Sequence, residues 1–193
     1  MSKRKGLNFS RKRRKISSDF LREFLNYILG IVLAVGLAFF ITYNWGVTTS
    51  VIGVSMENYL YSGQTILVSR LSYLVMRPKA GDVIVFKPNG NQNTHSYVKR
   101  VVAVPGDTVE FREGRLYVNG KIEERKLDKV ADPGIAENPI VLGNDEYFVL
   151  GDNRNNSEDS RSGNIGPVNK SFIEGRAWFK FSMKDSYMGF ISK

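Results

Sequence analysis

The sequence of 193 residues contains no cysteine and only one histidine. Without cysteine there is no disulfide framework, no thiolate metal site and no cysteine nucleophile, and a lone histidine excludes a multi-histidine metal site. Hydrophobic residues make up 42% of the chain and aromatic residues 12%, which is enough apolar material for a packed core. Any catalytic nucleophile is therefore a serine, a threonine, a lysine or a carboxylate.

Positive charge is concentrated at the N-terminal end. Residues 1–23 carry nine Lys or Arg against two Asp or Glu, whereas residues 24–193 have a net charge of only +2. No charged residue then occurs from Phe24 to Met56. A basic tail can bind nucleic acid through phosphate contacts, but a tail that leads into a long uncharged run is more typical of contacts with anionic lipid headgroups.

The uncharged run predicts a transmembrane helix over residues 24–47. A helix of this length measures about 35 Å at a rise of about 1.5 Å per residue, enough to span a bilayer, and Tyr27, Tyr43 and Trp45 bracket its apolar centre. A cleaved secretory signal has a similar pattern, but this run is too long and no small-residue cleavage site follows it. The basic flank predicts that residues 1–23 are cytoplasmic and residues 48–193 extracytoplasmic.

Beyond residue 47 the chain changes to short β-type runs separated by Gly, Pro and Asn, which predicts a mainly β domain of barrel or multi-sheet type. The expected strands are Thr65–Leu71, Asp82–Phe86, Tyr97–Val104, Thr108–Arg112, Arg115–Val118, Tyr147–Leu150 and Ile173–Phe181. Asn119-Gly120 is the strongest hairpin signal. Residues 88–94 and 126–142 are expected to be loops, the second a surface insertion, and the Asp-, Asn- and Ser-rich residues 151–166 a hydrogen-bonded loop.

Ser55 and Lys99 are the candidates for chemistry. Ser55 is flanked by apolar residues shortly after the membrane span, and Lys99 lies in a β-type run where a charge is out of place. A lysine in an apolar pocket loses solvation of its charged form, so its pKa falls and the neutral amine can accept a serine proton. Strand alternation puts Lys99 and Arg100 on opposite faces but does not say which face is buried. A Lys-Arg pair pointing to solvent from an edge strand explains the same residues.

Four segments together resemble the motifs of the type I signal peptidases, the bacterial membrane-anchored serine proteases. They are Gly53-Val54-Ser55-Met56, Gly81-Asp82-Val83-Ile84-Val85-Phe86, residues 97–107 (YVKRVVAVPGD) and residues 151–163 (GDNRNNSEDSRSG). They follow one another in the family's order behind an N-terminal anchor. The resemblance extends from the basic tail to residue 181. Gly53 in the nucleophile box is similar to the Gram-positive-like variants of the family.

The resemblance implies a role for each matching residue. Ser55 is the nucleophile, Lys99 the general base, and Ser157 hydrogen-bonds and orients the Lys99 amine. The Ser55 backbone N–H supplies part of the oxyanion hole, and Gly53 lets the chain approach closely there. A buried ion-pair network that supports the site is implied for Asp152, Asp159 and Arg161.

The resemblance also implies the function. It predicts a single-pass enzyme of the cell membrane that removes N-terminal signal peptides from secretory preproteins at the outer surface, through an acyl-enzyme. Small residues are preferred at the first and third positions before the cut, and the substrate binds as an added β-strand. No metal or organic cofactor is needed, and nucleic acid is not a partner.

One departure from the family pattern concerns the loop after the nucleophile. The family usually continues Ser-Met-x-Pro-Thr, whereas this chain has Asn58 and Tyr59 at the last two positions. Loss of the proline removes rigidity, which favours an altered preference or a lower rate. A paralogue specialised for pilus assembly and a non-catalytic preprotein-binding module stay as alternatives, while a self-cleaving repressor would need a soluble DNA-binding head. Met56 lines an apolar pocket or packs in the core.

Overall fold

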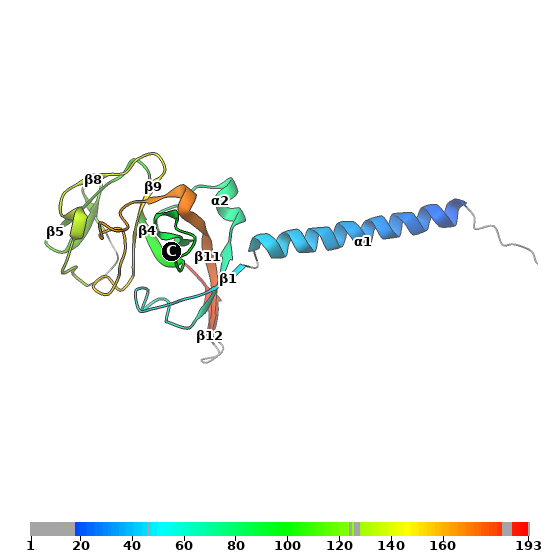
Figure 1. Ribbon diagram of the computed structural model, residues 1–193, viewed down its shortest axis with the longest axis horizontal. Helices are drawn as coiled ribbons and strands as arrows, with labels where there is room; N and C mark the ends of the chain where they lie inside the picture. The colour runs from blue at the N-terminus through cyan, green and yellow to red at the C-terminus, as the bar shows by residue number, and fades with distance from the viewer. Residues whose placement is uncertain (1–17, 46, 124, 126–127, 183–186, 193) are drawn as a thin grey trace, which may run out of the picture. The chain divides into compact units, whose positions relative to one another are not determined.

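The computed structural model describes residues 18–45, 47–123, 125, 128–182 and 187–192, and it divides into two units, residues 1–40 and 41–193 (Figure 1). Helix α1, Ser18–Trp45, carries an apolar stretch, Asp19–Tyr43, that is long enough to cross a membrane. The 25 residues of this apolar stretch measure roughly 37 Å along the helix. Most of the predicted basic tail lies outside the described residues.

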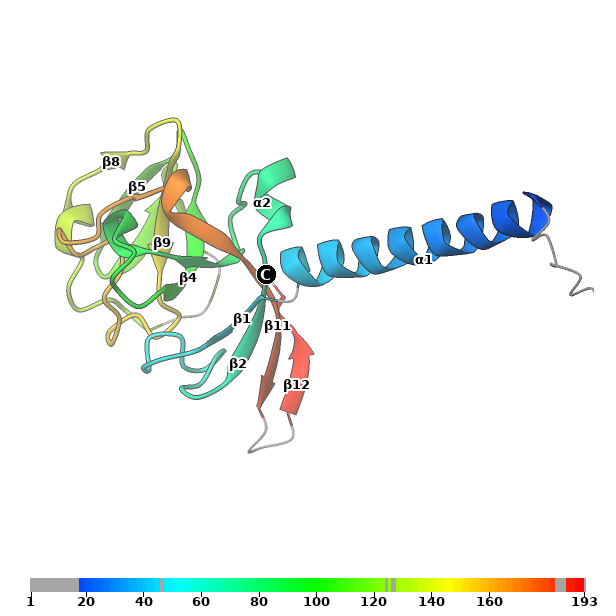
Figure 2. The same cartoon turned by 45° about the vertical axis from the view of Figure 1, so that its right-hand side comes forward.

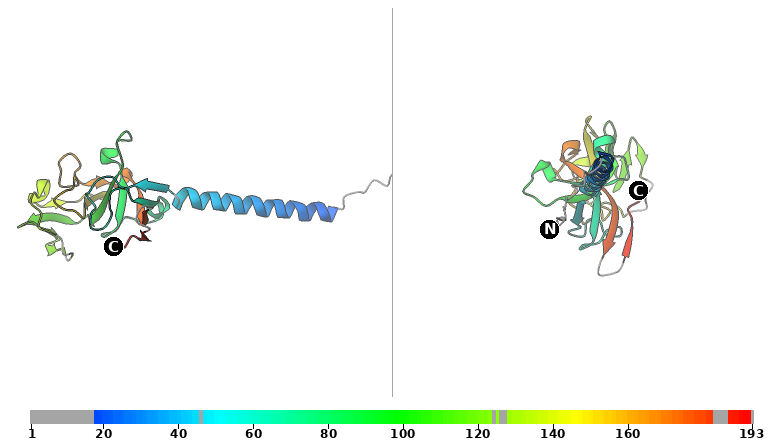
Figure 3. Two further views of the ribbon diagram at one scale, coloured as in Figure 1. Left: turned by 90° about the horizontal axis from the view of Figure 1, so that it is seen from below. Right: turned by 90° about the vertical axis from the view of Figure 1, so that its right-hand side faces the viewer.

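The rest of the described chain is mainly β, as predicted, and forms two antiparallel sheets (Figures 1 and 2). The larger has the order β1-β2-β11-β3-β4-β9-β10, and β12 pairs with β11. Its strands are β1 Val47–Ser50, β2 Thr65–Ser69, β3 Val83–Phe86, β4 Tyr97–Ala103, β9 Glu146–Leu150, β10 Val168–Asn169, β11 Ile173–Ser182 and β12 Tyr187–Phe190. The smaller has the order β7-β6-β5-β8. Its strands are β5 Thr108–Arg112, β6 Arg115–Val118, β7 Lys121–Ile122 and β8 Ile140–Val141. In the left view of Figure 3, β5 (green) and β12 (red) lie far apart within the unit of residues 41–193.

Turn chemistry explains where several strands end. Asn119 and Gly120 both have positive φ, 51° and 73°, which is the backbone of a tight hairpin turn and confirms the predicted hairpin between β6 and β7. The strand predicted over 65–71 is too long. It ends at Ser69, whose Oγ accepts a hydrogen bond from the Ser72 N–H, and the chain then turns into the short helix α2, Leu71–Val75.

The 3₁₀ helices are η1 Pro88–Gly90, η2 Gly134–Glu137 and η3 Lys170–Phe172. The first lies in a predicted loop, and the second lies in the segment 126–142 that the sequence predicts to be a surface insertion. That prediction is wrong for the described part of the segment, because Val130, Ala136 and Leu142 are buried in the core of the smaller sheet. Residues 126–127 lie outside the described part.

The core that matters most for the site lies under the loop that follows β1. Met56 and Leu60 are 1% and 0% exposed and pack with Ile66, Val83 and Ala177 from β2, β3 and β11. Of the two interpretations of Met56, core packing is therefore the one that the structure supports. Two buried side chains fix the loop on either side of residues 57–59, so the position of Ser55 is set by the core.

Candidate active site

Ser55 lies on a tight turn between β1 and β2. The N–H of Glu57 donates to the Val54 carbonyl (3.0 Å), and the N–H of Leu60 donates to the Met56 carbonyl (2.7 Å). The turn is also held from behind, because the Asn153 N–H donates to the Ser55 carbonyl (3.0 Å). The backbone of Ser55 is thus fixed by its own turn and by the polar loop 151–166.

Lys99 reaches Ser55 from the middle of the larger sheet. It lies on β4 opposite Ile84 of β3 and is only 4% exposed. Its Nζ donates a hydrogen bond to the Ser55 Oγ over 2.6 Å. The alternative of a solvent-facing Lys-Arg pair is wrong, since Arg100 on the other face is also buried, at 2% exposed.

The environment of Lys99 favours the neutral amine. Burial lowers the pKa of Lys99 from 10.5 to about 8; the charges of Asp159 and Glu158 oppose this change, and that of Arg161 adds to it. A lysine with such a pKa has a substantial neutral fraction near physiological pH. The neutral amine accepts a hydrogen bond from the Ser55 hydroxyl across the same contact, so the pair can move the serine proton.

Asp159 and Arg161 form a buried ion pair beside the dyad. The Arg161 Nε donates to Oδ1 of Asp159 over 2.8 Å, and the two side chains are 8% and 0% exposed. Asp159 Oδ2 also accepts from the Gly151 N–H (3.1 Å), while Arg161 donates to the carbonyl of Asp132 (3.1 Å). The pair therefore ties the start of the polar loop to residues 159–161 and ties the loop to Asp132.

Asp152 belongs to a different cluster, which corrects the prediction of a single network with Asp159 and Arg161. Its carboxylate accepts from Arg100 (2.7 Å) and from Arg125 (2.9 Å). Burial raises the pKa of Asp152, but the hydrogen bonds and charges of the two arginines outweigh burial and hold it below its usual range. The reason is the strand alternation of β4, which sends Lys99 toward Ser55 and Arg100 to the opposite face.

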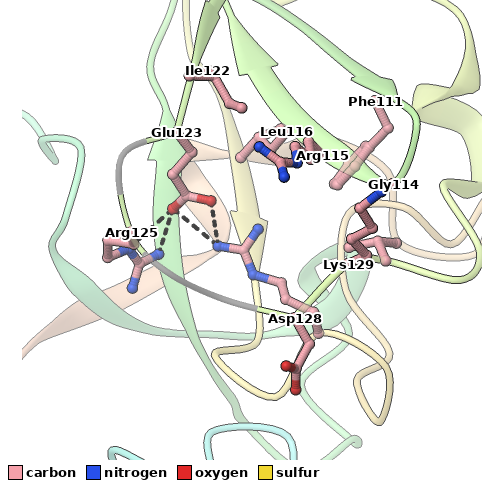
Figure 4. Close-up of a pocket in the computed structure, with 11 residues that line it drawn as sticks. Phe111, Gly114, Arg115, Leu116, Ile122, Glu123, Arg125, Asp128 and Lys129 are labelled. Atoms are coloured by element: carbon pink, nitrogen blue, oxygen red, sulfur yellow. Dashed lines mark hydrogen bonds and ion pairs between the residues drawn. The ribbon is translucent and has the colours of Figure 1, made fainter.

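Glu123 extends this second cluster. It lines a cavity of about 400 Å³, where Figure 4 shows its contact with Arg125. It accepts hydrogen bonds from Arg125 (2.8 Å) and from the buried Arg154 (2.9 Å). The Arg154 carbonyl in turn accepts from Arg161. The two ion-pair clusters are thus connected through the backbone of Arg154 rather than by a contact between Asp152 and Asp159.

Two glycines allow close backbone approach or an unusual conformation. A Cβ on Gly151 would collide with the Ser55 carbonyl and with the Ser157 Oγ, so only glycine fits between the nucleophile turn and the polar loop. Gly53 has φ of +84°, but a Cβ there would meet open space. Glycine is therefore favoured at position 53 by its backbone conformation and not by lack of space. The space beside Gly53 is free for a substrate.

Ser157 does not form the predicted hydrogen bond with Lys99. Its Oγ is buried without a hydrogen-bond partner among the described residues, because the side chain is directed to Gly151 behind the Ser55 carbonyl. Lys99 instead donates to Ser55.

The structure explains the departure at positions 58 and 59. Asn58 has φ of +74°, which proline cannot adopt, so this loop has a backbone that is incompatible with the usual Pro. The Tyr59 hydroxyl accepts from the Ser192 N–H (2.6 Å), and its ring lies under Lys180 Nζ, 4.3 Å from the ring centroid. Lys180 also donates to the Tyr59 carbonyl (2.6 Å). Tyr59 therefore ties the C-terminal residues to the nucleophile loop.

This contact leads to a prediction for Tyr59. We expect Tyr59→Phe to lower the free energy of unfolding by about 0.5–1.5 kcal/mol, because it removes the exposed hydrogen bonds between the Tyr59 hydroxyl and Ser192 and keeps the ring. Tyr59→Ala removes the ring and its cation contacts and is expected to lower it by roughly 3 kcal/mol. Thermal unfolding in detergent measures both. Equal losses in the two variants would contradict a packing role for the ring.

A cavity of about 340 Å³ opens beside the dyad. Its lining includes Ile52, Val54, Ser55, His95, Tyr97 and Glu158. The sequence interpretation missed the last three of these; strand alternation, which places Tyr97 on the same face as Lys99, was the one signal that pointed to any of them. Among the described residues there is no group of three or more His, Asp or Glu that could hold a metal ion.

The model of the family described as "Signal peptidase, peptidase S26" matches residues 24–182. The chain belongs to the S26 signal peptidases. It is therefore a serine peptidase, which confirms the predicted family and enzyme class. The match covers most of the apolar helix and strands β1 to β11, so it extends well beyond the residues around Ser55.

Curated relatives agree with the family. Signal peptidase I of Bacillus amyloliquefaciens is 36% identical over 173 residues, which are 81% of this chain and 87% of that protein. Signal peptidase I of Bacillus licheniformis is 31% identical and covers 86% and 92% of the two chains, and signal peptidase IB of Staphylococcus aureus is 31% identical and covers 83% and 90%. A crystal structure of a signal peptidase I from Enterococcus faecalis is 28% identical, with a TM-score of 0.41 over 52% of this chain and 97% of that one.

Proposed function

We propose that this signal peptidase removes signal peptides from secretory preproteins with Ser55 as the nucleophile and Lys99 as the general base. The observation that carries this proposal is the 2.6 Å contact between Lys99 Nζ and Ser55 Oγ, formed by a lysine that is 4% exposed. A nucleophile within hydrogen-bond distance of a base whose pKa is lowered by burial is the arrangement that such catalysis requires.

The reaction follows from this contact. Neutral Lys99 takes the proton of the Ser55 hydroxyl while Oγ attacks the carbonyl carbon of the scissile bond. The Lys99 ammonium then gives that proton to the departing amine, which leaves the signal peptide bound to Oγ as an ester. A water molecule, deprotonated by Lys99, hydrolyses the ester and restores the serine. The Ser55 N–H is proposed to stabilise the oxyanion in both steps.

The supporting residues act through the polar loop. Asp159 and Arg161 hold this loop against the nucleophile turn, and Gly151 permits the close approach. Gly53 leaves room for an extended substrate beside the exposed Ile52 and Val54, consistent with shallow apolar pockets for small side chains. Asp152 supports β4 from the face opposite the dyad.

The proposal includes the setting. The apolar helix α1 anchors the enzyme in the cell membrane, with the N-terminus cytoplasmic and the catalytic domain outside, and the basic tail contacts lipid headgroups rather than nucleic acid. The chemistry above requires no metal or organic cofactor. The assembled Ser-Lys contact favours a catalytic enzyme over a preprotein-binding module, and a specialised enzyme of pilus assembly would use the same dyad.

The pH dependence of cleavage tests the proposal. We expect kcat/KM for a preprotein in detergent micelles to rise with pH and to level off above a pKa of about 8, because only neutral Lys99 accepts the serine proton. Each pH unit below this value lowers the rate about tenfold. Circular dichroism over the same range controls for unfolding. An acid limb near pH 4 would assign the base to a carboxylate, and no cleavage of any preprotein would support the binding module.

A further inference from the structure

The catalytic cavity carries one carboxylate among its described lining residues, that of Glu158. Glu158 lies on the polar loop and is exposed, next to the buried Asp159. Another lining residue, Tyr97, donates a hydrogen bond from its hydroxyl to the Glu158 Oε2 over 2.9 Å. This bond raises the pKa of Tyr97, together with burial and the Glu158 charge. The tyrosine therefore holds the carboxylate at a defined place on the cavity wall.

Apart from His95, the ionisable side chains of the cavity and of the neighbouring ion pair leave Glu158 without a compensating charge during catalysis. Lys99 is neutral in the form that accepts the serine proton, and its amine is occupied by Ser55. Asp159 and Arg161 lie behind the dyad and neutralise each other at 2.8 Å. A substrate that enters the working enzyme thus meets one negative charge next to the scissile bond.

The Glu158 carboxylate also has room for another partner. An ionised carboxylate accepts about four hydrogen bonds, and the described residues supply Glu158 with the one from Tyr97. An ammonium or guanidinium group of a bound peptide can bind the remaining lone pairs. An acidic side chain in the same place would be repelled by a charge that Tyr97 keeps from turning away.

We propose that Glu158 is a specificity-determining residue that favours preproteins with a lysine or arginine beside the cut over those with an acidic residue there. The inference rests on the proposed function, since it takes the cavity at Ser55 as the place where substrate binds. Because Glu158 is exposed, its ion pair with a basic residue of the substrate adds little binding free energy. The expected preference for Lys over Glu is about three- to tenfold in kcat/KM.

The test uses peptides that differ at one position. Residues outside the small-residue positions are varied, namely the second before the cut and the first two after it, each as Lys, Gln or Glu. The full-length enzyme in micelles is compared with Glu158→Gln, Glu158→Lys and the control Glu137→Gln, which removes an exposed carboxylate from η2. At one or more positions we expect wild type and the control to rank Lys above Gln above Glu, Glu158→Gln to abolish the ranking, and Glu158→Lys to reverse it.

A second measurement separates a charge effect from damage to the loop. Because the charges of Glu158 and Asp159 raise the pKa of Lys99 while Arg161 lowers it, removal of one carboxylate lowers that pKa. We expect Glu158→Gln to shift the acid limb of kcat/KM to lower pH, whereas mere structural damage would lower the rate at every pH.

The outcomes distinguish this inference from the proposed function. If wild type cleaves, Ser55→Ala does not, and the ranking is the same in wild type and Glu158→Gln, the dyad stands and the specificity role is overturned. If Ser55→Ala cleaves as well as wild type, or wild type cleaves nothing, the proposed function fails and the inference fails with it.

Discussion

Lys99→Arg is expected to lower kcat/KM for preprotein cleavage by at least about 10³-fold, and Ser55→Ala to lower it by a similar factor. Arginine keeps the positive charge and much of the length, but its guanidinium is not deprotonated in proteins, so it cannot accept the Ser55 proton. The measurement is single-turnover cleavage of a preprotein in micelles at pH 9, where wild-type Lys99 is mostly neutral.

Two control variants accompany this experiment. Lys121→Arg makes the same exchange at an exposed position of β7 and is expected to leave the rate unchanged. Ser50→Ala is the control for Ser55→Ala: it makes the same exchange on β1 and is also expected to leave the rate unchanged. A Lys99→Arg enzyme with more than a tenth of the wild-type activity would show that Lys99 acts as a fixed charge, and the general-base role would have to be given up.

The same lysine makes a prediction about stability. We expect Lys99→Met to raise the free energy of unfolding at pH 7 by about 1–3 kcal/mol, because it removes a buried ammonium whose pKa falls from 10.5 to about 8 on folding. The buried ammonium destabilises the wild-type protein fully below pH 8. The effect disappears as the pH rises to 10.5, the pKa of the lysine in the unfolded chain. Denaturant unfolding at both ends of this range measures it. A Lys99→Met protein less stable than wild type at pH 7 would contradict the desolvation of the amine.

Much of the fold is contained in local sequence patterns, and what is missing has a physical reason. Thr108–Arg112 and Arg115–Val118 were predicted with their observed ends, because alternation and a tight turn define them. Strand β12 was missed, since Tyr187–Phe190 becomes a strand only through its pairing with Phe179–Ser182 of β11. Strand β1 was missed as well, because Val47–Ser50 is defined as a strand by its pairing with β2.

In the site, too, local sequence patterns predict some features, and packing between distant segments determines the others. The resemblance to the signal peptidases identified Ser55 and Lys99, and the structure places them in contact. Periodicity separated Lys99 from Arg100 without indicating that each face is buried, because other segments of the chain cover both faces of β4. Val98 packs in one core cluster and Val101 in another. The partner of Asp152 could not be predicted either, since Arg100 lies 52 positions away in the chain.

The Asp152 cluster gives the largest expected effect on stability. Asp152→Ala is expected to lower the free energy of unfolding by about 3–5 kcal/mol, because Arg100, with a side chain only 3% exposed, loses its carboxylate and stays buried as an unpaired charge. The matched control is Glu110→Gln, which keeps the size of the half-buried side chain, removes the charge that pairs with the exposed Arg112, and is expected to lower the free energy of unfolding by less than about 1 kcal/mol. Denaturant unfolding in micelles at pH 7 compares the two variants. Because the Asp152 carboxylate faces Arg100 and Arg125 rather than Lys99, its loss is expected to affect folding more than the acid limb of the pH profile. A shifted limb with unchanged stability would instead place Asp152 in electrostatic contact with Lys99.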